Sequence, residues 1–278
     1  MNHSQYMSIA AADQALLLQT VSAVQAAGRA VKALFDPAAR PHTMQEIASA
    51  IAANDGVSMS ILRQALAQAR PAARWDDDEE GRGPLPAGEW WVCDPVEGAI
   101  HHIHGSPHWG VTATLVRDNV PVLSAIYLPL TGDTYTALAG GGAWRDGTRL
   151  HVSSKSDLRA AMVGTGQAAP GEGAATHRRL GRSVTAMLEA ALVVQVSVPS
   201  TMQLIAVAGG HQDLFWQFSQ VRSGLFAGAL LVAEAGGRVS DLHGQPWHPG
   251  SGAFLAGAPA LTVAALAVLA NSDAGAAQ

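Results

Sequence analysis

Two carboxylates, three residues apart, follow an apolar run of aromatic and β-branched residues. The run is Trp90–Cys93, and Asp94 and Glu97 come directly after it. Because Pro95 has no N–H to donate to a strand ladder, we expect the strand to end at Asp94. Carboxylate and carbonyl oxygens at a strand end suit a hard cation such as Mg²⁺, and N–H groups at a helix start suit phosphate. The turn at Gly98 therefore indicates a site for metal and phosphate.

Histidines are concentrated just after this turn. They are His101, His102 and His104, with His108 close in sequence. Histidine is both an acid/base group near neutral pH and a ligand for transition metals. On a strand, His102 and His104 would share one face and, with the carboxylates, could bind Zn²⁺ or Mn²⁺. The alternative is that these are ordinary exposed or packed histidines.

Composition is that of an enzyme-sized soluble chain. It has 278 residues, 48% of them hydrophobic and 14% charged, and a net charge of −5. The negative charge argues against nucleic acid as a partner. The one cysteine, Cys93, excludes an intramolecular disulfide, and its apolar setting favours a buried, inert thiol. No long apolar stretch predicts a membrane span, and no basic signal-peptide region opens the chain, so we expect a cytoplasmic protein.

Apolar spacing predicts helices before the carboxylate motif and strands after it. A 3.6-residue period favours a long helix over 10–34 and two further helices over 44–53 and 57–69, separated by Asn54-Asp55-Gly56. Residues 74–88 read as a polar loop with an acidic cluster at 76–80. The strands predicted next are 90–93, 111–116, 122–127 and 134–138.

The second half alternates strands with helices, which is typical of a sheet covered by helices. The predicted strands are 161–164 and 192–198, and the predicted helices are 177–189, 202–208, 225–235 and 259–269. We therefore divide the chain into an N-terminal α+β part over 1–155, which carries the carboxylate motif, and a C-terminal α/β part over 156–270. Residues 271–278 are expected to be a disordered tail.

The segment Trp90 to Gly105 resembles the signature of the inositol monophosphatase family, W-[IV]-[IV]-D-P-[IL]-D-G-T-x-N-[FY]-x-x-G. Two further stretches, 137–153 and 227–237, match its A-x-x-G-x-G-A-x-x-[ND]-G…VS and A-G-x-x-[LI]-V-x-E-A-G-G patterns in the same order. The resemblance covers nearly the whole chain. It implies the layered αβαβα sandwich shared with fructose-bisphosphatases, usually dimeric, and Mg²⁺-dependent hydrolysis of small phosphate monoesters.

The resemblance also implies a set of ligands. Glu79 matches the family's upstream glutamate, although an acidic solvated loop is the alternative. Asp94 matches the bridging metal ligand, Val96 would offer its carbonyl, and Glu97 stands at the second carboxylate. Asp55 fits the position of an upstream acid, and a helix N-cap would explain it equally well.

Within the signature, two residues depart from the family pattern. Glu97 replaces aspartate and reaches one methylene further, which disturbs a tight octahedral Mg²⁺ site. Ala99 replaces the threonine whose hydroxyl helps to orient the attacking water. The phosphate itself would still be bound by the backbone at Gly98 and Ala99.

Two further departures lie in the second half of the chain. Gly224 stands where the family has the aspartate ligand of its second metal ion, and Arg222 lies two residues away. That arginine either binds an anion in place of the cation or is a surface residue. Gln217 replaces an acidic residue that contacts the sugar alcohol, which argues against inositol phosphate as the substrate.

The sequence thus predicts a divergent relative with weak or altered metal-dependent hydrolysis of a small phosphate monoester. We expect at most one well-occupied Mg²⁺ site, a small-molecule substrate with or without a phosphate group, no nucleic-acid or membrane partner, and a homodimer. Two alternatives stay open. One is an enzyme repurposed for small-molecule biosynthesis with histidine acid/base chemistry, with no metal or with a transition metal at the histidines. The other is a catalytically silent, ligand-binding relative.

Overall fold

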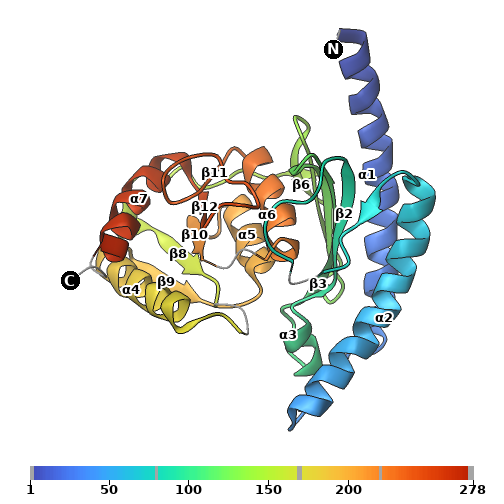
Figure 1. Ribbon diagram of the computed structural model, residues 1–278, viewed down its shortest axis with the longest axis horizontal. Helices are drawn as coiled ribbons and strands as arrows, with labels where there is room; N and C mark the ends of the chain where they lie inside the picture. Colours follow the sequence, from blue (N-terminus) through green and yellow to red (C-terminus); the bar gives the residue numbers. More distant parts are fainter. Residues whose placement is uncertain (1–2, 79–80, 168–170, 219–220, 275–278) are drawn as a thin grey trace. The chain divides into compact units, whose positions relative to one another are not determined.

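The structure is a computed structural model that describes residues 3–78, 81–167, 171–218 and 221–274 (Figure 1). The chain forms two compact units, one of residues 1–79 with 86–148 and the other of residues 80–85 with 149–278. The second unit thus recruits a short segment from the first half of the chain. Because residues 80–85 belong to the second unit, a single cut in the sequence cannot separate the two units. The division of the chain at residue 155 stays a prediction.

The first unit is built on a seven-stranded sheet in the order β1-β2-β3-β4-β5-β6-β7. Strands β1 and β2 pair in parallel, and the pairings from β2 to β6 are antiparallel. The strands are β1 (Arg74–Trp75), β2 (Glu89–Glu97), β3 (Gly110–Arg117), β4 (Val120–Leu128), β5 (Asp133–Leu138), β6 (Gly142–Arg145) and β7 (Thr148–Arg149). The four strands predicted here are confirmed, and β1 was not foreseen because two residues carry no alternation.

Tight turns hold this meander in register. Asp118 and Asn119 join β3 to β4 with φ of 51° and 66°, and Asp146 precedes Gly147 between β6 and β7 with φ of 48° and 79°. Consecutive positive φ values are those of the hairpin turns whose twist matches the twist of the strands. Asx and Gly residues tolerate this conformation, which is why the turns could be read from the sequence.

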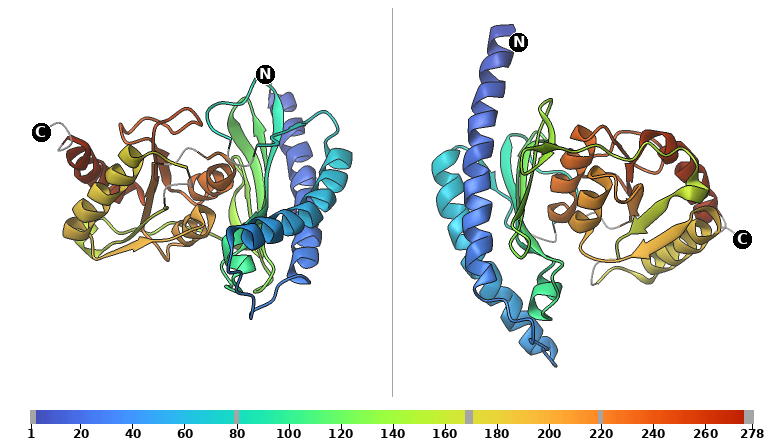
Figure 2. Two further views of the ribbon diagram at one scale, coloured as in Figure 1. Left: turned by 60° about the horizontal axis from the view of Figure 1, so that its bottom comes forward. Right: turned by 180° about the vertical axis from the view of Figure 1, so that it is seen from behind.

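Helices α1 (His3–Lys32) and α2 (Met44–Ala69) cover one face of this sheet (Figures 1 and 2). The face of α1 that packs on the sheet includes Leu17, Val24 and Val31, all at most 6% exposed. A Cβ at Gly28 would lie 2.5 Å from the Tyr127 ring, so α1 approaches β4 where only glycine leaves room.

The prediction of two helices separated at Asn54-Asp55-Gly56 is wrong. These residues lie inside α2, whose N-cap is Thr43 rather than Asp55. Asn54 and Ser58 are buried, and Leu62 and Leu66 continue the same face into the core. Tertiary packing of this face offsets the roughly 1 kcal/mol that a glycine costs inside a helix.

The second unit has a five-stranded mixed sheet in the order β11-β12-β10-β8-β9. Strands β8, β9 and β10 run parallel, and β12 pairs antiparallel with β10 and β11. The strands are β8 (Met162–Thr165), β9 (Val193–Val196), β10 (Leu214–Gln217), β11 (Arg238–Ser240) and β12 (Phe254–Gly257). Strands β10 to β12 were not predicted, because they have only three or four residues each and show no clear period; β10 and β12 are mostly apolar.

Helices cover both faces of this second sheet. They are α4 (Ala174–Ala190), α5 (Ser200–Ala208), α6 (Ser223–Glu234) and α7 (Pro259–Ala274), close to their predicted ranges. Leu214 and Trp216 of β10 share a core with α4 and α7. Phe215, which points to the opposite face, contacts Phe254, in the aromatic group that includes Phe226 of α6. Helix α7 extends into the predicted tail, and residues 275–278 lie outside the described part.

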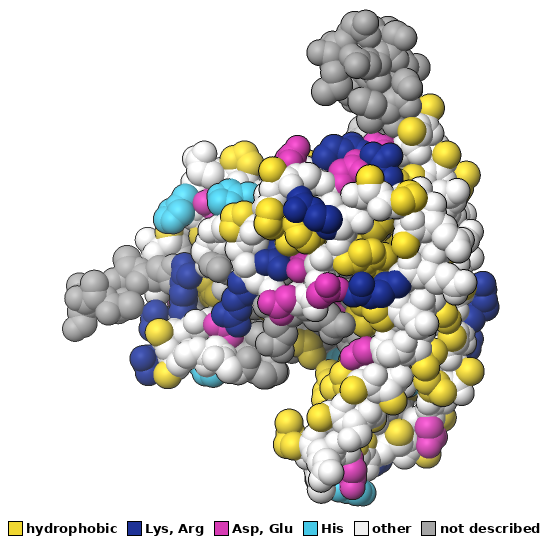
Figure 3. All heavy atoms as spheres, turned by 45° about the vertical axis from the view of Figure 1, so that its right-hand side comes forward, with side chains coloured by type: hydrophobic (Ala, Val, Ile, Leu, Met, Phe, Trp, Pro, Cys, Tyr) yellow, Lys and Arg dark blue, Asp and Glu magenta, His cyan; other side chains and the backbone are white. Residues whose placement is uncertain are grey.

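The surface is lightly charged. On the helices of the first unit, hydrophobic and uncharged polar side chains predominate, and acidic and basic groups are scattered (Figure 3). Within the described residues, no helix is both long and apolar enough to cross a bilayer.

Candidate active site

The carboxylate motif lies at an irregularity of β2 rather than beyond its end. Asp94 pairs with Thr112 of β3 and Glu97 pairs with Gly110, with a shift of register between them. The expectation that Pro95 ends the strand is therefore wrong. Proline falls in the irregular stretch, where a missing N–H breaks no ladder hydrogen bond.

Short hydrogen bonds fix this irregular stretch. The Asp94 N–H donates to Thr112 Oγ1 at 3.2 Å, and the Val96 N–H donates to Asp94 Oδ1 at 3.1 Å. The Val96 side chain is buried with Val31 and Trp109. The backbone between the two carboxylates is thus held by both hydrogen bonds and packing, and this holds the Val96 peptide in place.

The two carboxylates differ in exposure. Glu97 is only 3% exposed, whereas Asp94 is half-buried. Both make further interactions. Burying a carboxylate costs free energy unless it is hydrogen-bonded, paired with a charge or bound to a metal. With the Val96 carbonyl they form an all-oxygen donor set, which is the set that a hard cation prefers.

Gly98 turns the chain directly into helix α3 (Ala99–Ile103). It is the N-cap residue, with φ 85° and ψ 34°, and its carbonyl accepts from the N–H groups of His101 at 2.8 Å and His102 at 3.2 Å. This left-handed conformation favours glycine. Ala99 is the first helical residue, and its methyl group offers no hydrogen bond to water or substrate.

The histidines do not form one cluster. They lie on α3 and its C-cap rather than on a strand, so the expectation that His102 and His104 share a strand face is wrong. His102 is 2% exposed, receives the Asn54 amide at Nδ1 at 3.0 Å and reaches the Val31 carbonyl through Nε2 at 3.2 Å. Burial lowers the pKa of His102. Its ring packs edge-on against Phe35 and Trp109, so His102 has a structural role.

The remaining histidines are nearer the surface. His104 Nδ1 lies 2.8 Å from the Ile100 carbonyl and so helps to close α3. His101 and His108 share one hydroxyl, since Ser106 Oγ lies 3.2 Å from His101 Nδ1 and 3.1 Å from His108 Nδ1. Because a hydroxyl has one hydrogen, Ser106 couples the tautomers of the two rings. This chain of three side chains was not foreseen, although His108 had been noted as close in sequence.

In the second unit, Gln217 ends β10 and is 6% exposed. Its Oε1 accepts a short hydrogen bond from Ser200 Oγ at the start of α5. A Cβ at Gly166 would lie 2.5 Å from this same oxygen. The amide is thus held between two chain segments, and its partner Ser200 was not predicted because the two residues are 17 positions apart.

Arg222 is buried, so the expectation of a surface residue is wrong, and anion binding by this arginine stays a prediction. It is 7% exposed, and its Nη1 donates to the carbonyls of Arg82 at 2.6 Å and Gly83 at 3.1 Å. The backbone N–H of Arg222 also donates to the Gly81 carbonyl at 3.0 Å. Arg222 therefore ties the start of α6 to the segment 81–83. Gly224, two residues on, lies in the first turn of α6 and brings no carboxylate.

Glu79 lies outside the described residues, so its part in a metal site stays a prediction. Asp55 is half-buried in the middle of α2. In the described part of the chain, no group of three or more His, Cys, Asp or Glu side chains is arranged to hold a metal ion. The donor chemistry at Asp94, Val96 and Glu97 fits one hard cation, and a third carboxylate would have to come from Glu79.

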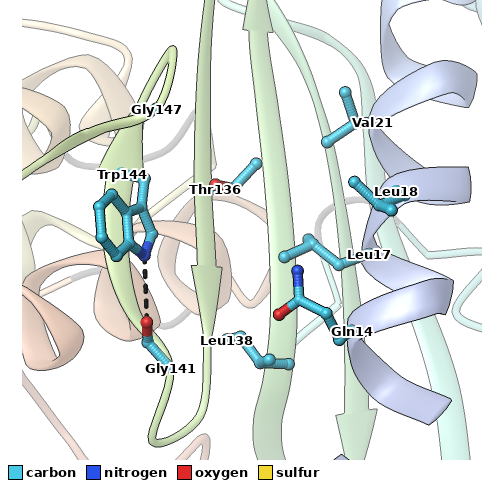
Figure 4. A pocket seen from close by; sticks show the side chains of 9 residues that line it. All are labelled: Gln14, Leu17, Leu18, Val21, Thr136, Leu138, Gly141, Trp144 and Gly147. Atoms are coloured by element: carbon cyan, nitrogen blue, oxygen red, sulfur yellow. Dashed lines mark hydrogen bonds between the residues drawn. The ribbon is translucent and has the colours of Figure 1, made fainter. Parts of the chain in front are cut away.

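A separate hollow of about 220 Å³ lies on the helical side of the first unit (Figure 4). It is bounded by Leu17 and Leu18 of α1, Thr136 and Leu138 of β5, and Trp144, whose indole N–H donates to the Gly141 carbonyl at 3.0 Å. It contains no carboxylate or histidine and takes no part in the motif.

The sequence profile of the inositol monophosphatase family matches residues 13–274. The chain belongs to the inositol monophosphatase family. It is 30% identical over 245 residues to an inositol-1-monophosphatase of Rhizobium meliloti, covering 86% of this chain and 91% of the relative. It is also 32% identical over 170 residues to the Nus factor SuhB of Pseudomonas aeruginosa, covering 60% and 62%.

Solved structures of the family share this fold. An inositol monophosphatase from Anabaena superposes with a TM-score of 0.78 at 23% identity, over 93% of this chain and 96% of the other. The predicted family and the predicted sandwich fold are both confirmed. Family membership makes small phosphorylated compounds and metal-dependent hydrolysis the general chemistry to which the site must be compared.

Proposed function

We propose that this chain hydrolyses a small phosphate monoester weakly, with one metal site in place of the family's full set. The proposal rests on a turn whose backbone suits metal and phosphate, combined with two positions whose side chains differ from the family pattern. Asp94, Glu97 and the left-handed Gly98 are held as a metal and phosphate turn requires. Ala99 and Gly224, in contrast, lack the hydroxyl and the carboxylate of the family pattern.

The metal would be Mg²⁺, held by Asp94, the Val96 carbonyl, Glu97 and Glu79. When bound, such an ion binds the phosphate, lowers the pKa of a water and neutralises the leaving oxygen. The chain itself supplies the phosphate turn, since the first N–H groups of a helix have no acceptor within the helix. These donors start at Gly98 and Ala99. The missing carboxylate at Gly224 limits the protein to at most one well-occupied ion.

The substrate is expected to differ from inositol 1-phosphate. Gln217 carries no charge, and its Oε1 already accepts from Ser200, so it offers a sugar hydroxyl a weaker acceptor than a carboxylate would. We therefore favour a small phosphate monoester with fewer hydroxyl groups near the phosphate.

Calorimetry with Mg²⁺ and phosphate release from a panel of small monoesters test the proposal together. We expect one weak binding event, lost in Asp94→Asn, and slow release that requires Mg²⁺. Gly224→Asp should strengthen Mg²⁺ binding. Two tight Mg²⁺ sites in the unaltered protein, or rapid hydrolysis of inositol 1-phosphate, would contradict the proposal.

A second candidate rests on the chain His101–Ser106–His108. Two imidazoles that share one hydroxyl can pass a proton between them, so acid/base chemistry without phosphate transfer is possible on this turn. A transition metal bound by the two rings is a variant of this candidate. Turnover that survives chelation of Mg²⁺ but is lost in His101→Asn would favour it. No turnover of any phosphorylated compound would favour a silent, ligand-binding relative.

We further propose that the protein is a homodimer. Strand β9 is an edge of the second sheet, and beside and within it Leu188, Leu192 and Val196 are 62%, 64% and 52% exposed. Exposed apolar edges favour pairing with another chain. Light scattering should give the mass of a dimer, and Leu192→Glu with Val196→Glu should give a monomer. Val263→Glu, on the exposed face of α7, is the matched control.

A further inference from the structure

An open hollow lies between helices α4 and α7 of the second unit, which lie side by side (Figures 1 and 2). Its volume is about 420 Å³, within the range of small-molecule sites. Most of its lining residues are polar: Arg178, Arg182, Thr185 and Glu189 from α4, and Asn271 and Ser272 from α7.

Positive charge is concentrated where α4 begins. The helix starts at Ala174, has no acidic residue in its first turn, and carries Arg178, Arg179 and Arg182 in its first half. Arg178 and Arg182 are one turn apart, so their charges repel each other. The arrangement is unfavourable unless an anion compensates it.

The neighbouring groups compensate only part of this charge. Arg179 lies over the Phe218 ring at 4.2 Å. Arg182 Nε donates to the Ser272 carbonyl at 3.2 Å, near the end of α7 where a cation is favoured. Glu172, the acid just before α4, pairs with Arg82 at 3.1 Å. Among the residues that the structure describes, Arg178 forms no hydrogen bond or ion pair.

We propose that this hollow binds the phosphate group of a small monophosphorylated molecule. A guanidinium group can donate two parallel hydrogen bonds to two oxygens of one phosphate group. Arg178 would donate from its guanidinium group. Arg182 would donate from its two terminal nitrogens, because its Nε already donates to the Ser272 carbonyl. The side-chain amide of Asn271 would add two N–H donors. None of these residues belongs to the proposed hydrolytic site, so the inference goes beyond the proposed function.

Glu189 gives the site a direction. It lies seven residues beyond Arg182, which is about 10 Å along the helix axis. A carboxylate at that end accepts from a hydroxyl or an ammonium group and repels a second phosphate. The expected ligand is therefore a monophosphate whose far end carries hydrogen-bond donors, rather than a polyphosphate.

Calorimetry with inorganic phosphate and with phosphoethanolamine, in the presence of a chelator, tests the inference. Both should bind, and Arg178→Ala should weaken both by about tenfold or more, as the loss of a charge-assisted contact requires. Glu189→Gln should weaken phosphoethanolamine but strengthen inorganic phosphate. Arg159→Ala, which removes an exposed arginine paired with Asp157, is the matched control and should change neither.

Asp94→Asn separates this site from the catalytic turn and should leave both affinities unchanged. Because Arg182 also holds α7, Arg182→Lys is preferred to alanine, with circular dichroism to check folding. The inference is overturned if millimolar phosphate gives no saturable binding, if binding survives Arg178→Ala, or if Asp94→Asn abolishes it.

Discussion

The proposed function assigns chemistry to two regions, the turn after β2 and the start of α6, and the residues of the two regions depart from the family pattern in different ways. The turn has two carboxylates and a left-handed glycine, with Glu97 in place of the pattern's aspartate and Ala99 in place of its threonine. The start of α6 has glycine at 224 in place of the carboxylate, and a buried arginine bonds to the carbonyls of Arg82 and Gly83. In the turn after β2, the residue that would orient the attacking water differs from the family pattern. At the start of α6, Gly224 stands at the position of the metal-binding aspartate, and the buried Arg222 lies two residues before it.

The two regions differ in how far the surrounding structure supports the residues of the proposed site. The β2 turn is fixed by backbone geometry, by Val96 in a small core and by bonds to Thr112, so it survives the change at Ala99. The α6 carboxylate had no such structural support. Arg222, two residues before Gly224, instead holds the segment 81–83 by hydrogen bonds.

The largest effect is expected from rebuilding both regions at once. Glu97→Asp, Ala99→Thr and Gly224→Asp together should raise Mg²⁺-dependent hydrolysis of inositol 1-phosphate by about tenfold or more, since preorganised groups of this kind commonly contribute about 10²-fold each. Steady-state phosphate release measures the gain. Because all three groups act on one reaction, the single variants should gain little, and their effects should not multiply.

A triple variant that folds but gains nothing would show that the site has been remodelled more deeply. Gly224→Asp is a fair single control for folding, because an acidic residue in the first turn of α6 is favoured by the helix dipole. Arg222 and the pair His101 and His108 would then be the residues to examine next.

Removing Arg222 should cost stability rather than chemistry alone. Arg222→Ala leaves the carbonyls of Arg82 and Gly83 without their buried donor, which is expected to lower the free energy of unfolding by about 2–4 kcal/mol. Denaturant unfolding measures this free energy. The control variant Arg159→Ala, which removes an exposed arginine, should unfold with a free energy within about 0.5 kcal/mol of that of the unaltered protein. Equal losses for the two variants would remove the structural role given to Arg222.

Much of the fold could be predicted because it depends on periodic patterns and ordered motifs. The sheet of the first unit follows from alternation and from Asx–Gly turns, and the family motifs identify the sandwich. The break at Asn54-Asp55-Gly56 was misplaced because local breakers were overridden by the packing of Leu62 and Leu66. The short strands β10 to β12 were missed because only tertiary contacts distinguish them from buried helix.

The site was predictable only where backbone and spacing define it. Asp94, Glu97 and Gly98 follow from the motif, but the roles of the histidines do not, because they depend on partners distant in sequence. His102 meets Asn54 from α2, and Arg222 meets residue 82 from the other half of the chain. No local pattern encodes such pairs.

His102 should make stability depend on pH. Its Nδ1 accepts from Asn54 and its Nε2 donates to Val31, which satisfies the neutral ring, and burial lowers its pKa. The folded state therefore binds a proton less readily than the unfolded chain. Stability from this group is complete above pH ~6.5, the unfolded value, and is lost as pH falls below it.

His102→Phe, which restores the aromatic residue of the family pattern, should flatten this slope between about pH 5 and 6.5. Urea unfolding at several pH values measures it, and His243→Gln at an exposed turn should keep the slope of the unaltered protein. An unchanged slope in His102→Phe would mean that another group titrates there.

The smallest effect concerns the Cys93 thiol beside Asp94. Cys93 is 4% exposed in the core of the first unit, and burial, reinforced by the neighbouring Asp94, raises its pKa. Little reactive thiolate is therefore present at neutral pH, and none of it is accessible without opening β2. We expect a maleimide to leave the native protein unlabelled, to label one site after unfolding, and to label Ser154→Cys, at an exposed position, at once. Rapid native labelling of Cys93 would mean that β2 opens readily. The catalytic turn would then owe its geometry to a ligand rather than to the packed strand described above.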